Sequence, residues 1–197
     1  YNLRTKKMKF YSHNPKDEQS LPGNNVRSIC IDHMKNIWVG TNLGLALFDE
    51  TSSRFRTFKP QEQNPNSPAG DNIHQIMEMD NHTLWIASDL GGISILDLNR
   101  YQHPYTEKLS FQRITKENSG LSSNNTRRII QDSFGNVWIG NFSSGIDFIP
   151  QSTSDFHTLG DLQQPLTNTF GIFCDRQGYL WMQAAYRRSP VLLLHLH

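Results

Sequence analysis

The sequence predicts an all-β fold built from four copies of one structural unit, and three observations support this prediction. Four tryptophans recur at intervals of 47, 53 and 43 residues, each preceded by an asparagine thirteen residues earlier and an isoleucine nine residues earlier. Each copy contains short β-prone runs separated by Asp, Asn, Gly and Ser clusters. Helix-type periodicity is absent. An interval of ~40 to 50 residues is typical of a four-stranded blade, so the sequence predicts a β-propeller of about four blades.

The strands of the predicted blades follow from the positions of the β-prone runs. In the first three copies the expected strands are 26–31, 37–41, 45–48 and 54–58; 73–79, 84–87, 92–97 and 109–114; and 126–131, 136–140, 145–149 and 155–159. The expected blades are about 24–59, 71–115, 124–160 and 167–197, within one propeller region that covers residues 1–197.

The recurring tryptophans are predicted to pack between neighbouring blades. A blade is a small sheet that cannot bury both of its faces alone, so blades stack radially and share a core. One tryptophan buries roughly 150 to 250 Å², which is enough to fill the space between two sheets. We therefore interpret these four residues as structural rather than as platforms for sugar rings: Trp38, Trp85, Trp138 and Trp181.

The turn that precedes each tryptophan has a characteristic pattern. An aspartate six residues before the tryptophan can accept hydrogen bonds from its own turn, and a glycine three residues before it can adopt a positive φ. Lys35 replaces this glycine in the first copy, and Met79-Asp80 shifts the aspartate in the second. We expect those two turns to be strained or differently shaped. The structural residues of the pattern are Asp32, Asp132, Asp175, Gly135 and Gly178.

The sequence at the two ends of the chain does not decide how the propeller closes. The last copy departs from the pattern after Trp181, and residues 184–197 are either a continuation with a third strand or an unrelated end. The segment 6–13 is spaced like an outer strand and is a candidate for completing the fourth blade. A closed four-blade ring, an open arc and an eight-blade dimer are all compatible with this spacing. Because the chain begins at Tyr1 without a leader, we expect a processed product or a fragment.

Composition excludes several classes of function. The net charge is +1, from 19 basic and 18 acidic residues scattered along the chain, so no basic stripe indicates nucleic-acid binding.

Cys30 and Cys174 lie in different copies, and we expect both to be free thiols. A disulfide between them would form only if their two blades were neighbours with suitable Cβ geometry. Nucleophile and metal-binding motifs are absent, so we expect no catalytic residues, no metal site and no cofactor. His195 and His197 alternate on a presumed strand, and we interpret them as structural or tag-like.

The runs Leu21 to Gly44 and Leu121 to Gly140 resemble the two-component regulator propeller repeat. That repeat has a leucine, a small residue, serine and asparagine before a strand, followed by Asp-x-x-Gly-Asn-x-Trp-Ile-Gly-Thr, and the resemblance extends from residue 21 to about 183. It implies a piece of a larger, seven-bladed propeller in the periplasmic sensor region of a hybrid two-component system. It also implies an oligosaccharide ligand, a histidine kinase beyond this chain, no enzymatic activity in this segment, and the remaining blades or a second copy as partners.

Polar residues at the start of each innermost strand are the candidate ligand-binding residues. In a propeller these positions face the channel entrance, and Phe170 is the exception in the fourth copy. The asparagines of the repeat, including Asn168, should occupy equivalent loop positions with side chains that bond local backbone. The candidates are Asn25, Arg27, Asn72, His74, Asn125, Arg127 and Arg128.

Two other functions remain open. Lyases of the streptogramin type are also propellers and use a histidine, acidic partners and a divalent cation, and His74 is the histidine in the equivalent position. The second alternative is a scaffold whose propeller face mediates dimerisation without binding a ligand.

Overall fold

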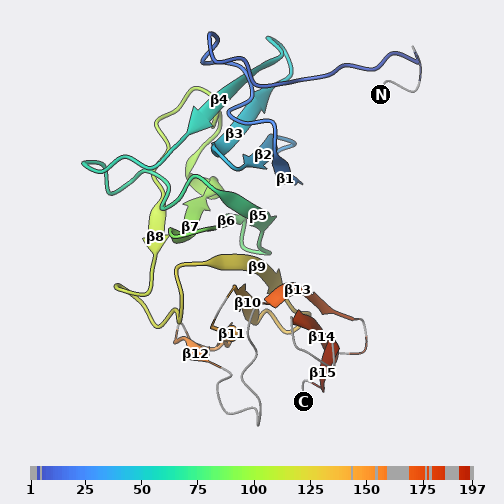
Figure 1. The fold of residues 1–197 in the computed structure, drawn as a ribbon, viewed down its shortest axis with the longest axis vertical. Helices are drawn as coiled ribbons and strands as arrows, with labels where there is room; N and C mark the ends of the chain where they lie inside the picture. Colours follow the sequence, from blue (N-terminus) through green and yellow to red (C-terminus); the bar gives the residue numbers. More distant parts are fainter. Residues whose placement is uncertain are drawn as a thin grey trace.

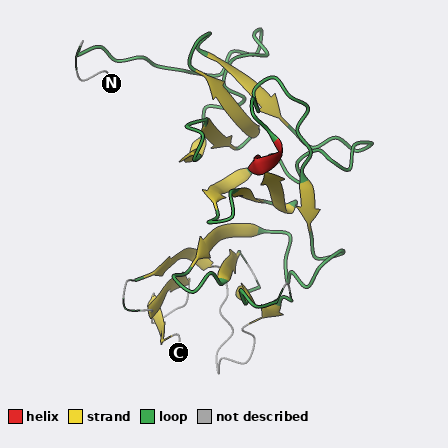
Figure 2. Ribbon diagram, turned by 180° about the vertical axis from the view of Figure 1, so that it is seen from behind, coloured by secondary structure: helices red, strands yellow, loops and turns green. Residues whose placement is uncertain are grey.

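The structure is a computed structural model that describes residues 4, 6–142, 144–153, 155–158, 169–175, 177, 179–184 and 191–195. The described chain forms four antiparallel sheets that follow one another along the long axis of the molecule (Figure 1). Apart from the short 3-10 helix η1 (Leu98–Arg100), every regular element described is a strand (Figure 2). The prediction of an all-β propeller fold is confirmed. Among the described residues, no helix is long and apolar enough to span a membrane.

Three sheets have four strands each, and three strands of the fourth are described. Blade 1 contains β1 (Val26–Ile31), β2 (Ile37–Thr41), β3 (Gly44–Asp49) and β4 (Arg54–Phe58). Blade 2 contains β5 (Ile73–Glu78), β6 (Thr83–Ser88), β7 (Gly92–Asp97) and β8 (Gln112–Ile114). Blade 3 contains β9 (Thr126–Gln131), β10 (Val137–Asn141), β11 (Ile146–Ile149) and β12 (His157–Thr158). Blade 4 contains β13 (Thr169–Cys174), β14 (Tyr179–Ala184) and β15 (Val191–His195).

Within each blade the strands pair in chain order, from the innermost strand outwards. The observed strands agree with the expected ones to within one residue at each end, except for two outer strands: β8 begins at Gln112 rather than at residue 109, and β12 begins at His157 rather than at residue 155. Leu109 and Phe111 are instead buried in the core, and the Phe111 amide donates to the Asn66 carbonyl. The backbone before Gln112 therefore bonds to the preceding loop rather than to β7.

The core lies between the blades, and the tryptophan of one blade packs against the next. Trp38 and Trp138 are buried in this way, and Trp85 is half-buried in the equivalent position. The apolar residues that surround these three rings include Ile73, Ile76 and Leu84 of blade 2, Ile129 and Ile139 of blade 3, and Ile172, Leu180 and Met182 of blade 4. The interior is thus a series of sheet-to-sheet interfaces, as stacked blades require.

The turn before each tryptophan ties the hairpin to the core. The carboxylates of Asp32, Asp132 and Asp175 each accept a hydrogen bond from the indole Nε1 of their own tryptophan, at 2.9, 2.9 and 2.8 Å. In blade 2, Met79 occupies the aspartate position, and Thr83 Oγ1 accepts the Trp85 indole hydrogen bond instead. The second turn is therefore differently bonded, as its sequence predicts.

A left-handed residue lies three positions before each of the first three tryptophans. Gly135 has φ of 83°, whereas Lys35 has 70° and His82 has 60° in the same place. A side chain with a Cβ is strained in this region, so the first two turns keep the shape of the third at an energetic cost. Gly178, the equivalent residue of blade 4, lies outside the described residues.

The four sheets form an open arc rather than a closed four-blade ring. Blades 1 and 4 lie at opposite ends of the molecule (Figures 1 and 2), and β1, β5, β9 and β13 contact one another in succession. Equivalent residues differ accordingly in burial. Ile29 is 63% exposed at one end, whereas Ile76 and Ile129 are buried, and Trp181 is 40% exposed at the other end.

The segment 6–13 does not form the outer strand of blade 4. Residues 6–13 contain no strand, and Tyr11 packs edge-on against Phe48 and Phe55 at 4.9 and 5.5 Å between ring centroids. Tyr11 is 38% exposed and lies against aromatic rings of blade 1, while Met8 and Phe10 remain exposed. These ring contacts place the segment at blade 1, at the other end of the arc from blade 4.

The two cysteines lie on blades 1 and 4 and are free, as expected. Both are half-buried, and burial raises the pKa of the Cys30 and Cys174 thiols. Neither side chain is therefore activated as a thiolate.

Candidate functional site

The candidate residues at the start of the innermost strands are the extra residues of β-bulges. The pairing register shifts at Arg27 in blade 1, at His74 in blade 2 and at Arg127 in blade 3. The same shift occurs at Phe170 in blade 4. A bulge leaves its extra residue outside the ladder and redirects the side chain. One redirected polar side chain is thus supplied by each of three consecutive blades.

These three side chains meet around His74. His74 Nε2 lies 3.0 Å from Asp89 Oδ2, and Arg27 Nη1 lies 3.0 Å from the same ring nitrogen. Arg127 Nη1 contacts the His74 ring, and Arg127 Nη2 lies 3.1 Å from Asp89 Oδ1. Asn72 accepts from Arg27 at 2.7 Å and donates to Asp89 at 2.7 Å. We call these five residues the bulge cluster: Arg27, Asn72, His74, Asp89 and Arg127.

The electrostatics of the bulge cluster keep its histidine neutral. Burial is the largest cause that lowers the pKa of His74, and the nearby Arg127 and Arg27 charges lower it further, against the opposing effect of Asp89. Asp89 Oδ2 can accept from a protonated Nε2, whereas Arg27 and Arg127 can donate to whichever ring nitrogen carries no proton. Two arginines and one aspartate then give the cluster a net charge of about +1.

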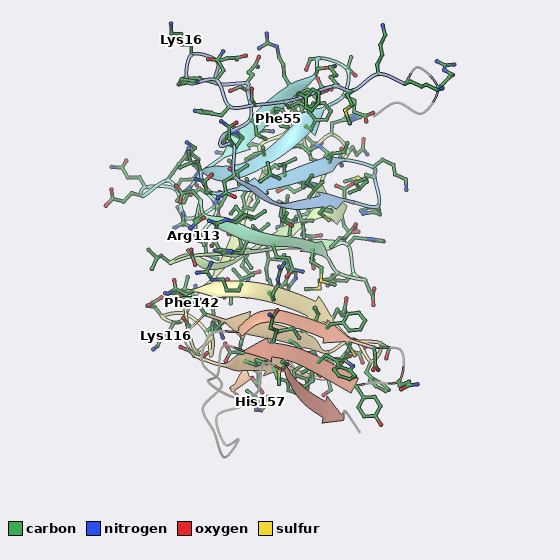
Figure 3. All side chains as sticks on the ribbon, turned by 45° about the vertical axis from the view of Figure 1, so that its right-hand side comes forward. Lys16, Phe55, Arg113, Lys116, Phe142 and His157 are labelled. Atoms are coloured by element: carbon green, nitrogen blue, oxygen red, sulfur yellow. The ribbon has the colours of Figure 1, made fainter. Side chains whose placement is uncertain are left out.

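A groove of 460 Å³ lies beside the bulge cluster. Asn72, Asp89, Asn125 and Arg127 contribute polar groups to it, and Phe142 contributes an aromatic ring. The Arg127 guanidinium lies over this ring, 4.6 Å from its centroid, and Figure 3 shows Phe142 beside the start of β9. A larger hollow of 810 Å³ lies between residues 13–22 and β4, but the bulged side chains do not line it. We therefore place the candidate site at the smaller groove.

The repeat asparagines occupy equivalent positions in the first three blades, as predicted. The backbone carbonyl of each asparagine accepts a hydrogen bond from an amide in the turn between the second and third strands of its own blade. The pairs are Asn25 with Asn42, Asn72 with Asp89, and Asn125 with Phe142. The prediction that their side chains bond local backbone is wrong for two of them. Asn72 bonds to side chains of the bulge cluster, and Asn125 Oδ1 accepts from the Leu90 amide of blade 2, because neighbouring turns lie closer than the local backbone. Asn168 lies outside the described residues.

Three candidate residues do not join the cluster, and two members of the site were not named as candidates. Asn125 lines the groove, whereas Asn25 and Arg128 are exposed; the Phe170 side chain lies outside the described residues. The two members not named are Asp89 and Phe142, which lie in turns four residues after Trp85 and Trp138. That position carries Asn, Asp and Phe in the first three copies. Variation at one loop position of an otherwise regular repeat is a signal that could have identified them.

The bulge cluster suits recognition rather than acid–base chemistry. Arg27 and Arg127 present fixed guanidinium donors, which match carboxylate or sulfate oxygens and also hydroxyl groups. A lyase of the streptogramin type would need a divalent cation near His74, and two adjacent guanidinium groups would repel it. The geometry therefore favours binding of a neutral or anionic polar ligand.

Comparisons with known proteins agree with this architecture. The model of a family described as "Two component regulator propeller" matches residues 20–43 and 120–143. The structure is similar to the extracellular domain of the hybrid two-component system BT4673 from B. thetaiotaomicron, with a TM-score of 0.73 and 21% identity over 94% of this chain. This chain spans only 26% of that domain.

Two further solved structures share the fold. PorZ, a surface component of the type-IX secretion system of Porphyromonas gingivalis, has a TM-score of 0.63 and 18% identity, with 94% of this chain and 28% of PorZ covered. YCF48 from Cyanidioschyzon merolae has a TM-score of 0.60 and 14% identity, with 89% of this chain and 52% of YCF48 covered. No curated protein matches in sequence. The chain thus carries two segments that match the two-component regulator propeller repeat, residues 20–43 and 120–143, within a propeller fold.

Proposed function

We propose that this chain is part of the periplasmic sensor region of a hybrid two-component system, and that its bulge cluster binds an oligosaccharide. The sensor belongs to an inner-membrane protein whose histidine kinase lies outside this chain and whose remaining blades adjoin the open ends of the arc. This segment recognises the ligand and does not catalyse a reaction. The family match and the similarity to an extracellular domain of a hybrid two-component system support the assignment.

The observation that carries the proposal is the convergence of bulged side chains from three successive blades. Arg27 and Arg127 lie more than 45 residues from His74 in sequence, yet both contact its ring, beside a groove that Arg127 lines. A structural core would not need two guanidinium groups and a neutral imidazole at one point. Arg127 Nε and Asp89 Oδ1 are buried without a hydrogen bond among the described residues, although the Asp89 oxygen lies 3.1 Å from Arg127 Nη2. Such incompletely paired polar groups are costly unless a ligand contributes to the network.

The site composition favours a sugar that carries carboxylate or sulfate groups. Both arginines can donate to such oxygens, and the net positive charge excludes a cationic ligand. The exposed edge of the groove provides the aromatic ring of Phe142, which can pack against the apolar face of a sugar ring. The groove volume of 460 Å³ is suited to a few sugar units rather than a polymer held along its whole length.

Isothermal titration calorimetry with a panel of neutral, uronate-containing and sulfated oligosaccharides tests the proposal. We expect saturable binding of an acidic member and a loss of affinity of about 10- to 100-fold for each arginine removed, because a charge-assisted hydrogen bond contributes ~1.5 to 3 kcal/mol. The test variants are Arg27→Ala and Arg127→Ala, singly and together. Arg127→Lys keeps a positive charge near Asp89 but removes the planar guanidinium group that can donate two parallel hydrogen bonds. A loss of affinity in this variant therefore reports on ligand recognition rather than on the stability of the fold.

The matched control replaces two arginines that form ion pairs elsewhere. Arg54→Ala with Arg100→Ala removes the same number of charges from exposed positions and should leave the affinity unchanged. Unchanged affinity in the Arg27→Ala/Arg127→Ala variant would refute the site assignment. If the intact multi-blade sensor binds no oligosaccharide, the scaffold function is favoured, and turnover in a lyase assay would favour the enzymatic alternative.

A further inference from the structure

A second cluster of titratable side chains lies at the opposite end of β1 and β5 from the bulge cluster. His33 follows the end of β1, and Glu78 is the last residue of β5. His82 lies in the turn between β5 and β6. Because His33 belongs to blade 1 while Glu78 and His82 belong to blade 2, the cluster spans the interface between the two blades.

The three side chains converge on one point. Glu78 Oε1 lies 2.5 Å from His33 Nδ1 and 3.2 Å from His82 Nδ1. The two imidazole rings stack with 3.9 Å between their centroids and an interplanar angle of 29°. One potential ligand atom from each residue lies within 4.8 Å of the others. Two ligand atoms of a tetrahedral zinc ion lie roughly 3.3 to 3.6 Å apart when the zinc–ligand bonds are about 2.0 to 2.2 Å long. Small shifts of the three side chains would bring their ligand atoms to these separations.

The surrounding structure holds these ligands in place. The His33 amide donates to Glu78 Oε2 at 2.8 Å, which fixes the carboxylate and leaves Oε1 directed at the two rings. The turn that carries His33 is anchored by Asp32, which accepts from the buried Trp38 indole. Ligands supported by a second layer of hydrogen bonds on rigid turns form well-ordered metal sites.

His82 occupies the position where the equivalent turn of blade 3 has Gly135. Both residues have positive φ, which costs nothing for glycine and is unfavourable for histidine. Lys35 has the same conformation in blade 1, and His82 differs from it in placing an imidazole against Glu78 and the His33 ring. The rings of His33 and His82 are partly exposed, so an ion can enter from solvent and retain a position for water.

We propose that His33, Glu78 and His82 bind one divalent transition-metal ion of the zinc class across the interface between blades 1 and 2. Two imidazole nitrogens and one carboxylate suit Zn²⁺, whereas Mg²⁺ and Ca²⁺ prefer sites built entirely from oxygen. The ion would link the β1–β2 turn to β5 and the β5–β6 turn, and so hold the two blades together. This site is independent of the oligosaccharide proposal, since it uses other residues at the other end of the strands.

Calorimetric titration of the whole chain with zinc chloride tests this site. We expect one ion per chain and a rise in Tm of about 5 to 10 °C when free Zn²⁺ exceeds its dissociation constant by roughly 100-fold. Glu78→Gln, His33→Ala and His82→Gly should each weaken binding by at least about tenfold. The same titration with magnesium chloride should give no saturable heat.

His82→Gly is the decisive variant because it is expected to fold. Glycine relieves the left-handed strain, so the metal-free Tm should equal or exceed that of the unaltered chain while the zinc-dependent rise disappears. His103→Ala, at an exposed histidine in the loop before β8, is the control and should keep the full response. Zinc binding of unchanged affinity in His82→Gly would overturn the proposal and place the ion elsewhere, for example at His195 and His197. Absence of saturable zinc binding to the unaltered chain would overturn it too, and would leave the cluster as a hydrogen-bonded contact between blades.

Discussion

Trp138 and Trp181 are equivalent residues whose surroundings differ, so replacing each by alanine measures the packing between blades. Trp138 is 4% exposed, lies among Ile146, Ile172 and Leu180, and packs against Phe148 with 4.2 Å between ring centroids and an interplanar angle of 36°. Trp138→Ala leaves a cavity between blades 3 and 4 and should lower the free energy of unfolding by about 3 to 5 kcal/mol.

Trp181→Ala should cost less, because Trp181 lies at the open end of the arc. Its indole donates to Asp175 as the Trp138 indole donates to Asp132, but the Trp181 bond is exposed, so water replaces it more readily and its loss costs less. The Trp181 side chain is 40% exposed. About a third more of the side-chain surface is in contact with water at Trp181 than at Trp138. For a tryptophan that buries ~200 Å², at ~25 cal/mol/Å², this difference makes the loss of unfolding free energy roughly 1.5 to 2 kcal/mol smaller for Trp181→Ala.

Urea denaturation followed by far-UV circular dichroism measures both losses on the same scale. A loss below ~1 kcal/mol for Trp138→Ala would place this ring on the surface and refute the inter-blade interpretation. Equal losses for the two variants would show that Trp181 is covered in solution, and would refute the open arc as the state of the isolated chain. Trp138→Phe, which keeps most of the ring volume, is the control and should cost clearly less than alanine.

Three further predictions concern single residues. Lys35→Gly should raise the free energy of unfolding, measured in urea, by ~0.5 to 1 kcal/mol. The reason is that glycine adopts the positive φ of this position without strain, and the exposed lysine side chain contributes little. A decrease would contradict the strain argument. Asp132→Ala should lower it by roughly 2 to 4 kcal/mol, since a buried carboxylate that accepts four hydrogen bonds is lost, whereas Asp155→Ala at an exposed site should be nearly neutral. The pKa of His74 is lowered in the folded state, so the unfolded chain binds a proton more readily and stability is lost as the pH falls below about 6.5. The difference in unfolding free energy between pH 7 and pH 5 should therefore shrink in His74→Asn, and an unchanged difference would show that His74 does not titrate as described.

The repeat could be predicted from sequence because its signals are local. The asparagine, the turn aspartate and the tryptophan recur at fixed spacing, and each acts within its own blade, as the bonds from Trp38 to Asp32 and from Trp138 to Asp132 show. The same spacing identified Arg27 and Arg127 as equivalent. Strand and turn preferences depend mainly on neighbouring residues, so they can be read without the fold.

Contacts between blades could not be predicted in this way. Asp89 joins the bulge cluster because the β6–β7 turn lies against Asn72 before β5 and Arg127 of blade 3, and nothing in its local sequence indicates those partners. His33 and Glu78 are 45 residues apart and meet only because β1 packs beside β5. Spacing alone made the segment 6–13 a candidate for blade 4, whereas Tyr11 contacts the Phe48 ring of blade 1.

Side-chain NMR of the arginines shows whether the bulge cluster is the ligand site. The measurement follows the guanidinium Nε–H signals of the labelled chain during titration with an acidic oligosaccharide. We expect the signals of Arg27 and Arg127 to shift together with one saturation curve, while those of Arg54 and Arg100 stay in place. Saturable shifts confined to Arg54 or Arg100, or calorimetric binding that leaves Arg27 and Arg127 unperturbed, would contradict the placement of the ligand at the bulge cluster.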